Sequence, residues 1–249
     1  MIDERGGSFA ALRSMPGMSR RTGSADAGIG DRPRAFDAMR HLPSRRRNSK
    51  GSETSRRSSH MPSTFTKKLA TVAQEQHRKF SLFRENQNPL SAQIRLYWTE
   101  LGLSFPGVGI AWSAVFVSWC MKQAGATKHQ FGFSARHGDF IHAAIANAQA
   151  GQGVFLGRRV AQYAPKVGDL LHNNRSGNSF DFDFAATHRK YESHSAIVVE
   201  VGTDNRGRYL WTIGGNEGDS VGIKEVRLTS TGLVKNPGGL YISIVETTL

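Results

Sequence analysis

Two residues of types that can take part in nucleophilic chemistry stand at the starts of predicted elements. Ser113 lies at the start of a helix within the apolar stretch 111–120, and His194 is the first residue of an apolar strand. The start of a helix carries free backbone N–H groups and a partial positive charge. A side chain there can attack a carbonyl while those donors hold the oxyanion that forms. The arrangement indicates acyl-transfer chemistry.

Apolar residues at helical spacing predict four helices between residues 64 and 148. The helix with Ser113 ends at Gly125, a residue type that commonly terminates helices. The helix after it contains an apolar stripe that includes Phe140 and Ile141. The predicted helices cover residues 64–80, 90–101, 112–124 and 137–148.

Beyond residue 151 the pattern changes to strands, which are predicted at residues 168–172, 194–201, 208–213, 221–226 and 240–245. Residues 196–199 are all apolar, which is typical of a central strand covered on both faces. A short turn at residues 204–207 predicts a hairpin. The sequence therefore predicts an α+β fold in which N-terminal helices pack on a largely antiparallel sheet.

Charge is concentrated in the first 60 residues, where 13 Lys and Arg stand against six Asp and Glu. This segment accounts for +7 of the net charge of +13. Its arginines lie among Ser, Gly and Pro without interleaved aromatic residues, so we expect a disordered basic tail and no specific nucleic-acid partner. Residues 61–249 are expected to form one folded domain.

The tail lacks the apolar core of a secretory signal peptide, and no apolar run is long enough to span a membrane. Export would require a non-classical route. An alternative is that translation begins at Met61, since Ser63 and Thr64 resemble the opening of a capped helix.

Other motifs point to no metal or cofactor. Asp181 and Asp183 alternate with phenylalanines and are more simply an exposed loop than a metal site. Cys120, the only cysteine, is expected to be a buried structural residue. Residues 174–191 form a long insertion before the strand with His194, and such loops often act as lids or selectivity elements.

Four short motifs carry a resemblance to a known family. They are the Trp-Ser-Ala opening at Trp112, the Gly168-Asp169 pair, the Ser193-His194 pair, and Gly-Gly-Asn ending at Asn216. With these motifs the chain resembles the NlpC-type and CHAP-like branch of the papain-like cysteine hydrolases. More closely, residues 88–246 resemble the bacterial family called domain of unknown function 2272.

The resemblance implies a catalytic set. In the wider superfamily a cysteine begins the helix, a histidine at a strand start is its base, and a polar residue on the next strand orients that histidine. These positions become Ser113, His194 and Asn216, and Glu217 or Asp219 are alternatives to Asn216. Substrate contacts are expected from Trp112, His137 and Ser134, although His137 and Ser134 also suit ordinary helix capping.

Serine in place of cysteine leaves three alternatives. A serine hydroxyl is far less acidic than a thiol and needs a base during attack. The alternatives are a working Ser-His-Asn site, an inactive relative that keeps the cleft for binding, and an enzyme that uses another group. The resemblance implies a peptidoglycan-directed amidase or peptidase in the bacterial periplasm or outside the cell. Another hypothesis is a secreted antibacterial effector with an immunity or secretion partner.

Overall fold

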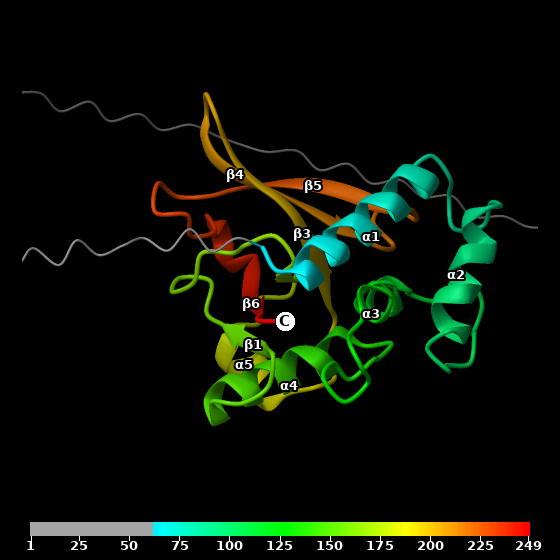
Figure 1. The fold of residues 1–249 in the computed structure, drawn as a ribbon, viewed down its shortest axis with the longest axis horizontal. Coiled ribbons are helices and arrows are strands. Elements are labelled where there is room, and N and C mark those ends of the chain that lie inside the picture. Colours follow the sequence, from blue (N-terminus) through cyan, green and yellow to red (C-terminus); the bar gives the residue numbers. More distant parts are fainter. Residues whose placement is uncertain (1–61) are drawn as a thin grey trace, which may run out of the picture. The chain divides into compact units, whose positions relative to one another are not determined.

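The computed structural model describes residues 62–249, so the predicted tail over residues 1–60 and the alternative start at Met61 lie outside the described residues. The described part is an α+β fold, as predicted, and its open antiparallel sheet has six strands (Figure 1). Helices come first and most strands follow.

The four predicted helices are confirmed, with small shifts at their ends. Ser63 caps the first of them, because its hydroxyl accepts the Thr66 N–H at 3.1 Å. Gly125 ends the third in the left-handed conformation, at φ 116°. The helices are α1 (Thr64–Phe80), α2 (Leu90–Thr99), α3 (Ser113–Ala124), α4 (His137–Ala150), the short α5 (Phe182–Thr187) and the 3-10 turn η1 (Pro237–Gly239).

The strands are β1 (Phe155–Arg158), β2 (Leu170–Asn174), β3 (Ser193–Asp204), β4 (Gly207–Gly214), β5 (Gly222–Arg227) and β6 (Tyr241–Thr247). Their order in the sheet is β1-β6-β2-β3-β4-β5, and every neighbouring pair is antiparallel. Three elements were not predicted: β1, α5 and the three-residue turn η1. All three are short, and short segments give too few repeats for a period to be recognised.

The sheet is covered on both faces, as residues 196–199 predicted. Ile197 belongs to the main core, which the sheet shares with α1, α3 and α4. Val198 points the opposite way into a smaller cluster with Leu171 and Ile244, covered by Val160 and Tyr163. Because successive side chains of a strand alternate between faces, the central strand β3 joins the two cores.

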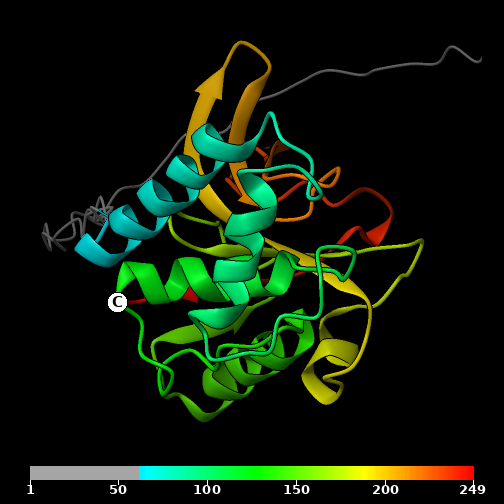
Figure 2. The same ribbon diagram turned by 90° about the vertical axis from the view of Figure 1, so that its right-hand side faces the viewer.

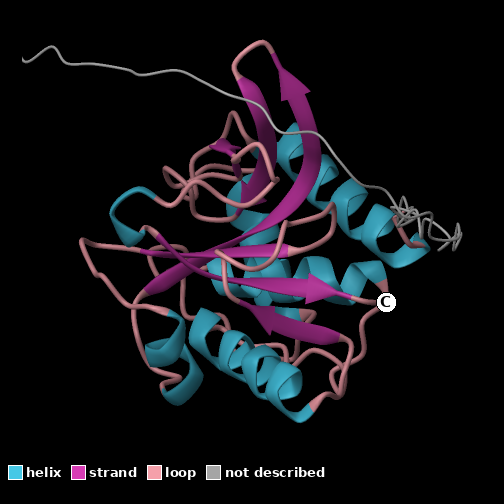
Figure 3. Ribbon diagram, turned by 90° about the vertical axis from the view of Figure 1, so that its left-hand side faces the viewer, coloured by secondary structure: helices cyan, strands magenta, loops and turns pink. Residues whose placement is uncertain are grey.

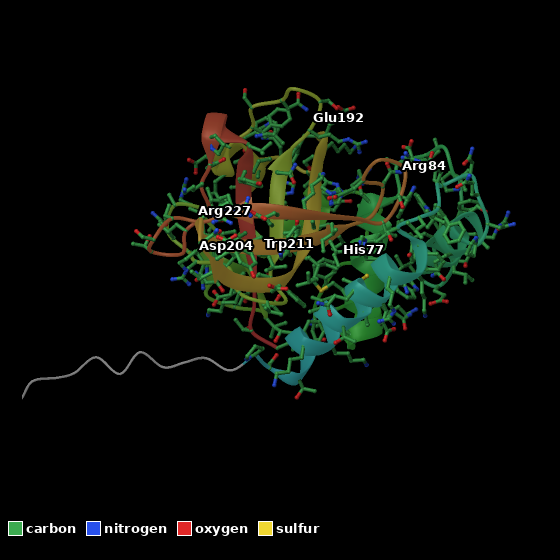
Figure 4. All side chains as sticks on the ribbon, turned by 90° about the horizontal axis from the view of Figure 1, so that it is seen from above. His77, Arg84, Glu192, Asp204, Trp211 and Arg227 are labelled. Atoms are coloured by element: carbon green, nitrogen blue, oxygen red, sulfur yellow. The ribbon has the colours of Figure 1, made fainter. Side chains whose placement is uncertain are left out.

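The β3–β4 hairpin extends beyond the rest of the sheet, and α1 lies beside it (Figures 2 and 3). Near its tip Arg227 donates to Asp204 at 2.9 Å, and both are labelled in Figure 4. Arg206 bridges Asp204 and Glu225 there.

No helix within residues 62–249 is long and apolar enough to cross a membrane.

Candidate active site

Ser113 is the first residue of α3, where the helix has no side-chain cap. The first backbone bond of the helix runs from Phe116 N–H to the Trp112 carbonyl at 3.0 Å. Within residues 62–249 the N–H groups of Ser113 and Ala114 have no hydrogen-bond partner. These are donors that a helix start leaves open, and they adjoin the Ser113 hydroxyl.

The Ser113 hydroxyl contacts His137, the first residue of α4. Oγ lies 2.7 Å from Nε2 of His137, and both side chains are buried. Burial, followed by the influence of His194, holds the pKa of His137 well below its usual value, so the ring is neutral at pH 7. Its Nδ1 is buried without a partner among the described residues. We assign the proton to Nε2, because an orphaned N–H is rarer in proteins than an unpaired acceptor.

A second histidine, His194, is paired with a carboxylate. Its Nε2 lies 2.8 Å from Oε1 of Glu217, and Nζ of Lys224 lies 3.3 Å from the other oxygen of that carboxylate. Burial opposes ionisation of Glu217, but the hydrogen bond to His194 and the charges of His194 and Lys224 outweigh it and lower the pKa of Glu217. The carboxylate is therefore ionised at neutral pH.

The two histidines are adjacent. Their ring centroids are 5.4 Å apart in an edge-to-face arrangement. A Cβ on Gly214 would lie 2.8 Å from Nε2 of His194, and one on Gly215 would lie 2.5 Å from Cβ of Phe116. These glycines therefore let the end of β4 approach both His194 and the first turns of α3, which brings the strand half of the site to the helical half.

A cavity of about 330 Å³ opens at Ser113. Ala111, Ser113 and Ala114 line it from α3 and the residue preceding its cap, and further lining residues come from the start of α4 and from the insertion before β3. These others are Ala135, Arg136, His137, Arg175, Ser176, Tyr191, Glu192 and Ser193. The predicted insertion at residues 174–191 thus forms part of one wall. Figure 4 labels Glu192, which directly follows this segment.

The structure corrects the predicted placement of Asn216. Its amide donates to Oε2 of Glu85 at 3.0 Å, and Glu217 takes the position beside His194 that was predicted for Asn216. The cause is local backbone geometry, since Asn216 adopts a left-handed conformation at φ 56° and its side chain turns toward Glu85. Glu217 was one of the two alternatives to Asn216 that the sequence analysis named for orienting His194.

Two of the three residues predicted to contact substrate, Trp112 and Ser134, do not line this cavity. Trp112 is fully buried and donates to the same Glu85 oxygen at 2.9 Å, which suits packing and not substrate contact. Ser134 supports the start of α4, because its hydroxyl donates to Asp139 at 2.6 Å and accepts the Arg136 N–H. His137 is the one of the three that lines the cavity.

His194 does not line that cavity, and within residues 62–249 no hydrogen bond joins it to Ser113. The sequence predicted Ser113, His194 and His137 near one cleft, and the structure brings them into one cluster. The sequence reasoning missed the contact between Ser113 and His137 itself. From the sequence, His137 suggests ordinary helix capping, because it follows Ser134 by three residues. Only the tertiary fold reveals its contact with Ser113.

The remaining sequence predictions concern metals and the cysteine. Among residues 62–249 no group of three metal-ligating side chains is present. Asp181 caps α5, accepting the Phe184 N–H at 2.8 Å, and Asp183 pairs with Arg159. Cys120 is a buried free thiol, as predicted, and burial raises its pKa well above the usual value.

Comparison with known proteins finds one family model. Residues 90–244 match the family described as "Uncharacterized protein conserved in bacteria (DUF2272)". No curated protein and no solved structure matches the chain.

Proposed function

Since the chain belongs to the bacterial family DUF2272, matched over residues 90–244, we propose that this family fold carries a hydrolase of the papain-like NlpC and CHAP type. In this proposal the protein cleaves amide bonds in peptidoglycan stem peptides. The observation that carries it is the Ser113 hydroxyl at an uncapped helix start, inside a cavity and 2.7 Å from a neutral histidine. That is the local setting of an acyl-transfer nucleophile.

The proposed reaction begins with attack of Ser113 Oγ on an amide carbonyl. The Oγ–C bond forms, the oxyanion receives hydrogen bonds from the free N–H groups at the start of α3, and the hydroxyl proton passes to a histidine. The C–N bond then breaks, and the amine leaves with that proton. Water attacks the resulting ester in the same way and releases the acid and the free serine.

We propose His194 as the base, because a base must hold a positive charge in the transition state. Glu217 stabilises that charge on His194. Among residues 62–249 His137 has no such partner, since its Nδ1 is unpaired there and burial disfavours its charged form. His137 instead donates Nε2–H to Ser113 Oγ and orients the oxygen.

The transfer requires Ser113 and His194 to come within hydrogen-bonding distance. Catalytic hydrogen bonds are often long in ligand-free enzymes and shorten in the substrate complex. A change of the Ser113 χ1 rotamer redirects Oγ without moving the backbone.

Digestion of purified peptidoglycan by the full chain tests the proposal. Wild type, Ser113→Ala and Ser113→Cys are compared, and released fragments are identified by mass spectrometry. We expect wild type to release fragments, Ser113→Ala to lose about a hundredfold or more in rate, and Ser113→Cys to retain activity. Undiminished cleavage by Ser113→Ala would rule out the assignment of the nucleophile.

A binding module is the second candidate, and one observation favours it. Ser113 is hydrogen-bonded to a neutral histidine, and the carboxylate that would activate a base belongs to a different histidine. A relative in which serine replaces the catalytic cysteine could bind peptides in this cavity without cleaving them. If the protein is a binding module, the same digestion should show no activity in wild type and a gain of activity in Ser113→Cys.

A further inference from the structure

Glu85 joins the two halves of the candidate site through one carboxylate oxygen. Its Oε2 accepts the indole N–H of Trp112 at 2.9 Å and the side-chain amide of Asn216 at 3.0 Å. Trp112 is the cap residue directly before Ser113, and Asn216 directly precedes Glu217. One acceptor thus holds the neighbour of the proposed nucleophile and the neighbour of the carboxylate that serves the proposed base.

The contact with Trp112 fixes where the Glu85 carboxylate lies. Trp112 is fully buried and its ring stacks on Tyr97, with the ring centroids 6.0 Å apart. A buried N–H without an acceptor costs free energy, so the indole keeps the carboxylate in place. Glu85 then offers Asn216 an acceptor whose position is set by the core around α3.

The contact with Asn216 fixes the turn that directs Glu217. Asn216 is in the left-handed conformation at φ 56°, which is unfavourable for residues other than glycine and persists where surrounding contacts hold it. Within residues 62–249 the hydrogen bond to Glu85 is the only one that the Asn216 side chain makes. Loss of this acceptor should therefore release the turn that places Glu217 beside His194.

The far end of the same loop is held without the Glu85 side chain. Ser220 is buried, and its hydroxyl donates to the Phe80 carbonyl at 3.1 Å. The backbone N–H of Glu85 donates to the Asp219 carbonyl at 2.7 Å. Removal of the Glu85 side chain should thus shift the turn locally and leave the chain folded.

We propose that Glu85 is a positioning residue of the active site, whose carboxylate aligns the loop carrying Glu217 with the helix start carrying Ser113. Glu85 lies before residues 90–244, so the site depends on a segment outside the part of the chain that matches the family. The inference rests on the proposed function for its effect on the rate. Its effect on the contact between Glu217 and His194 does not require catalysis.

Titration of the Glu217 carboxyl group by carbon-13 NMR in the full chain tests the inference without substrate. Burial raises the pKa of Glu217, but His194 and Lys224 outweigh burial and lower it on balance. We expect Glu85→Ala to raise this pKa, because Glu217 moves away from His194. Glu85→Gln should leave it unchanged, because the amide oxygen can accept both donors. No rise in Glu85→Ala, or an equal rise in Glu85→Gln, would overturn the inference.

Steady-state rates on soluble peptidoglycan fragments supply the second measurement. We expect Glu85→Ala to lower kcat about tenfold to a hundredfold with KM changed less than about threefold, as for a small misplacement of a catalytic group. Glu85→Gln should restore kcat to within about threefold of wild type.

The matched control is Glu100→Ala. Oε2 of Glu100 accepts the Trp119 indole N–H at 2.7 Å and the Gln123 amide at 2.9 Å, so this variant removes the same kind of contact from the later turns of α3. It should change neither kcat nor the pKa of Glu217. Changes equal to those in Glu85→Ala would show that the effect is not specific to Glu85 and would overturn its role.

The two measurements separate this inference from the proposed function. If wild type cleaves no peptidoglycan fragments and the pKa of Glu217 still rises only in Glu85→Ala, the positioning role stands and the hydrolase proposal fails. If wild type cleaves them and Glu85→Ala keeps both its kcat and the pKa of Glu217, the hydrolase proposal stands and the positioning role is wrong.

Discussion

The two histidines near Ser113 differ in how a positive charge on each ring would be stabilised. His194 has the ionised Glu217 at 2.8 Å. His137 has Nε2 beside Ser113, and its Nδ1 is buried without a partner in the described part of the chain. A neutral ring that cannot easily be protonated is a good orienting donor and a poor base. The difference in partners therefore separates the roles proposed for the two residues.

Replacing Glu217 should slow the chemical step more than it weakens binding. We expect Glu217→Gln to lower kcat about tenfold to a hundredfold with KM changed less than about threefold, because the imidazolium of His194 loses its counter-charge in the transition state. His194→Gln should lower kcat at least as much. Steady-state rates on soluble peptidoglycan fragments provide the measurement.

The control for this prediction is Glu225→Gln, which removes a carboxylate of the ion-pair group near the hairpin tip. It should leave kcat unchanged. If His137→Gln abolished activity while His194→Gln and Glu217→Gln did not, His137 would be the base and the roles assigned here would be reversed.

At the scale of elements, the site depends on the close approach of the end of β4 to α3. Gly215 lies where a Cβ would meet Phe116 Cβ at 2.5 Å and the Trp112 ring at 2.7 Å. Phe116 and Trp112 are fully buried in the aromatic cluster with Tyr97, so neither can move aside cheaply. This contact holds the loop with Glu217 against the helix that carries Ser113.

A methyl group at position 215 should therefore separate the two halves of the site. We expect Gly215→Ala to lower the free energy of unfolding by about 1–3 kcal/mol, the usual cost of overpacking, and to reduce activity as well. Gly132→Ala is the matched control, since nothing lies within 4 Å of its added Cβ. Urea unfolding of the three proteins measures the effect, and equal midpoints would contradict this description of the packing.

For the molecule as a whole, buried histidines link stability to pH. His172 is completely buried between Ser195 and Tyr191, and burial lowers its pKa to about 3. Burial also lowers the pKa of His137. The unfolded chain takes up protons at these rings below about pH 6.5 and the folded chain does not, so their contribution to stability is lost as the pH falls. Asp169 acts oppositely, since burial raises its pKa to about 7.

Comparison with a variant isolates the histidine effect from that of Asp169. Between pH 7 and pH 5 the free energy of unfolding should fall by about 2 kcal/mol more for the wild type than for His172→Gln. The reason is that one ring protonated only in the unfolded chain changes this free energy by about 1.4 kcal/mol per pH unit below 6.5. The exposed His129→Gln should follow the wild type. Urea unfolding at both pH values measures this difference, and parallel curves for wild type and His172→Gln would show that His172 is not buried as a neutral ring.

The longer elements and the candidate nucleophile could be predicted from the sequence, because both depend on local patterns. Period, caps and turn residues predict α1 over Thr64–Phe80, the start of α3 to within one residue of Ser113, and a largely antiparallel sheet. The family over residues 90–244 also follows from local motifs. Which side chains meet depends on the tertiary structure, since the partners of Ser113 and His194 are 24 and 23 residues away along the chain. Asn216 and Glu217 are neighbours in sequence, and only the left-handed backbone at Asn216 determines that Glu217 faces His194.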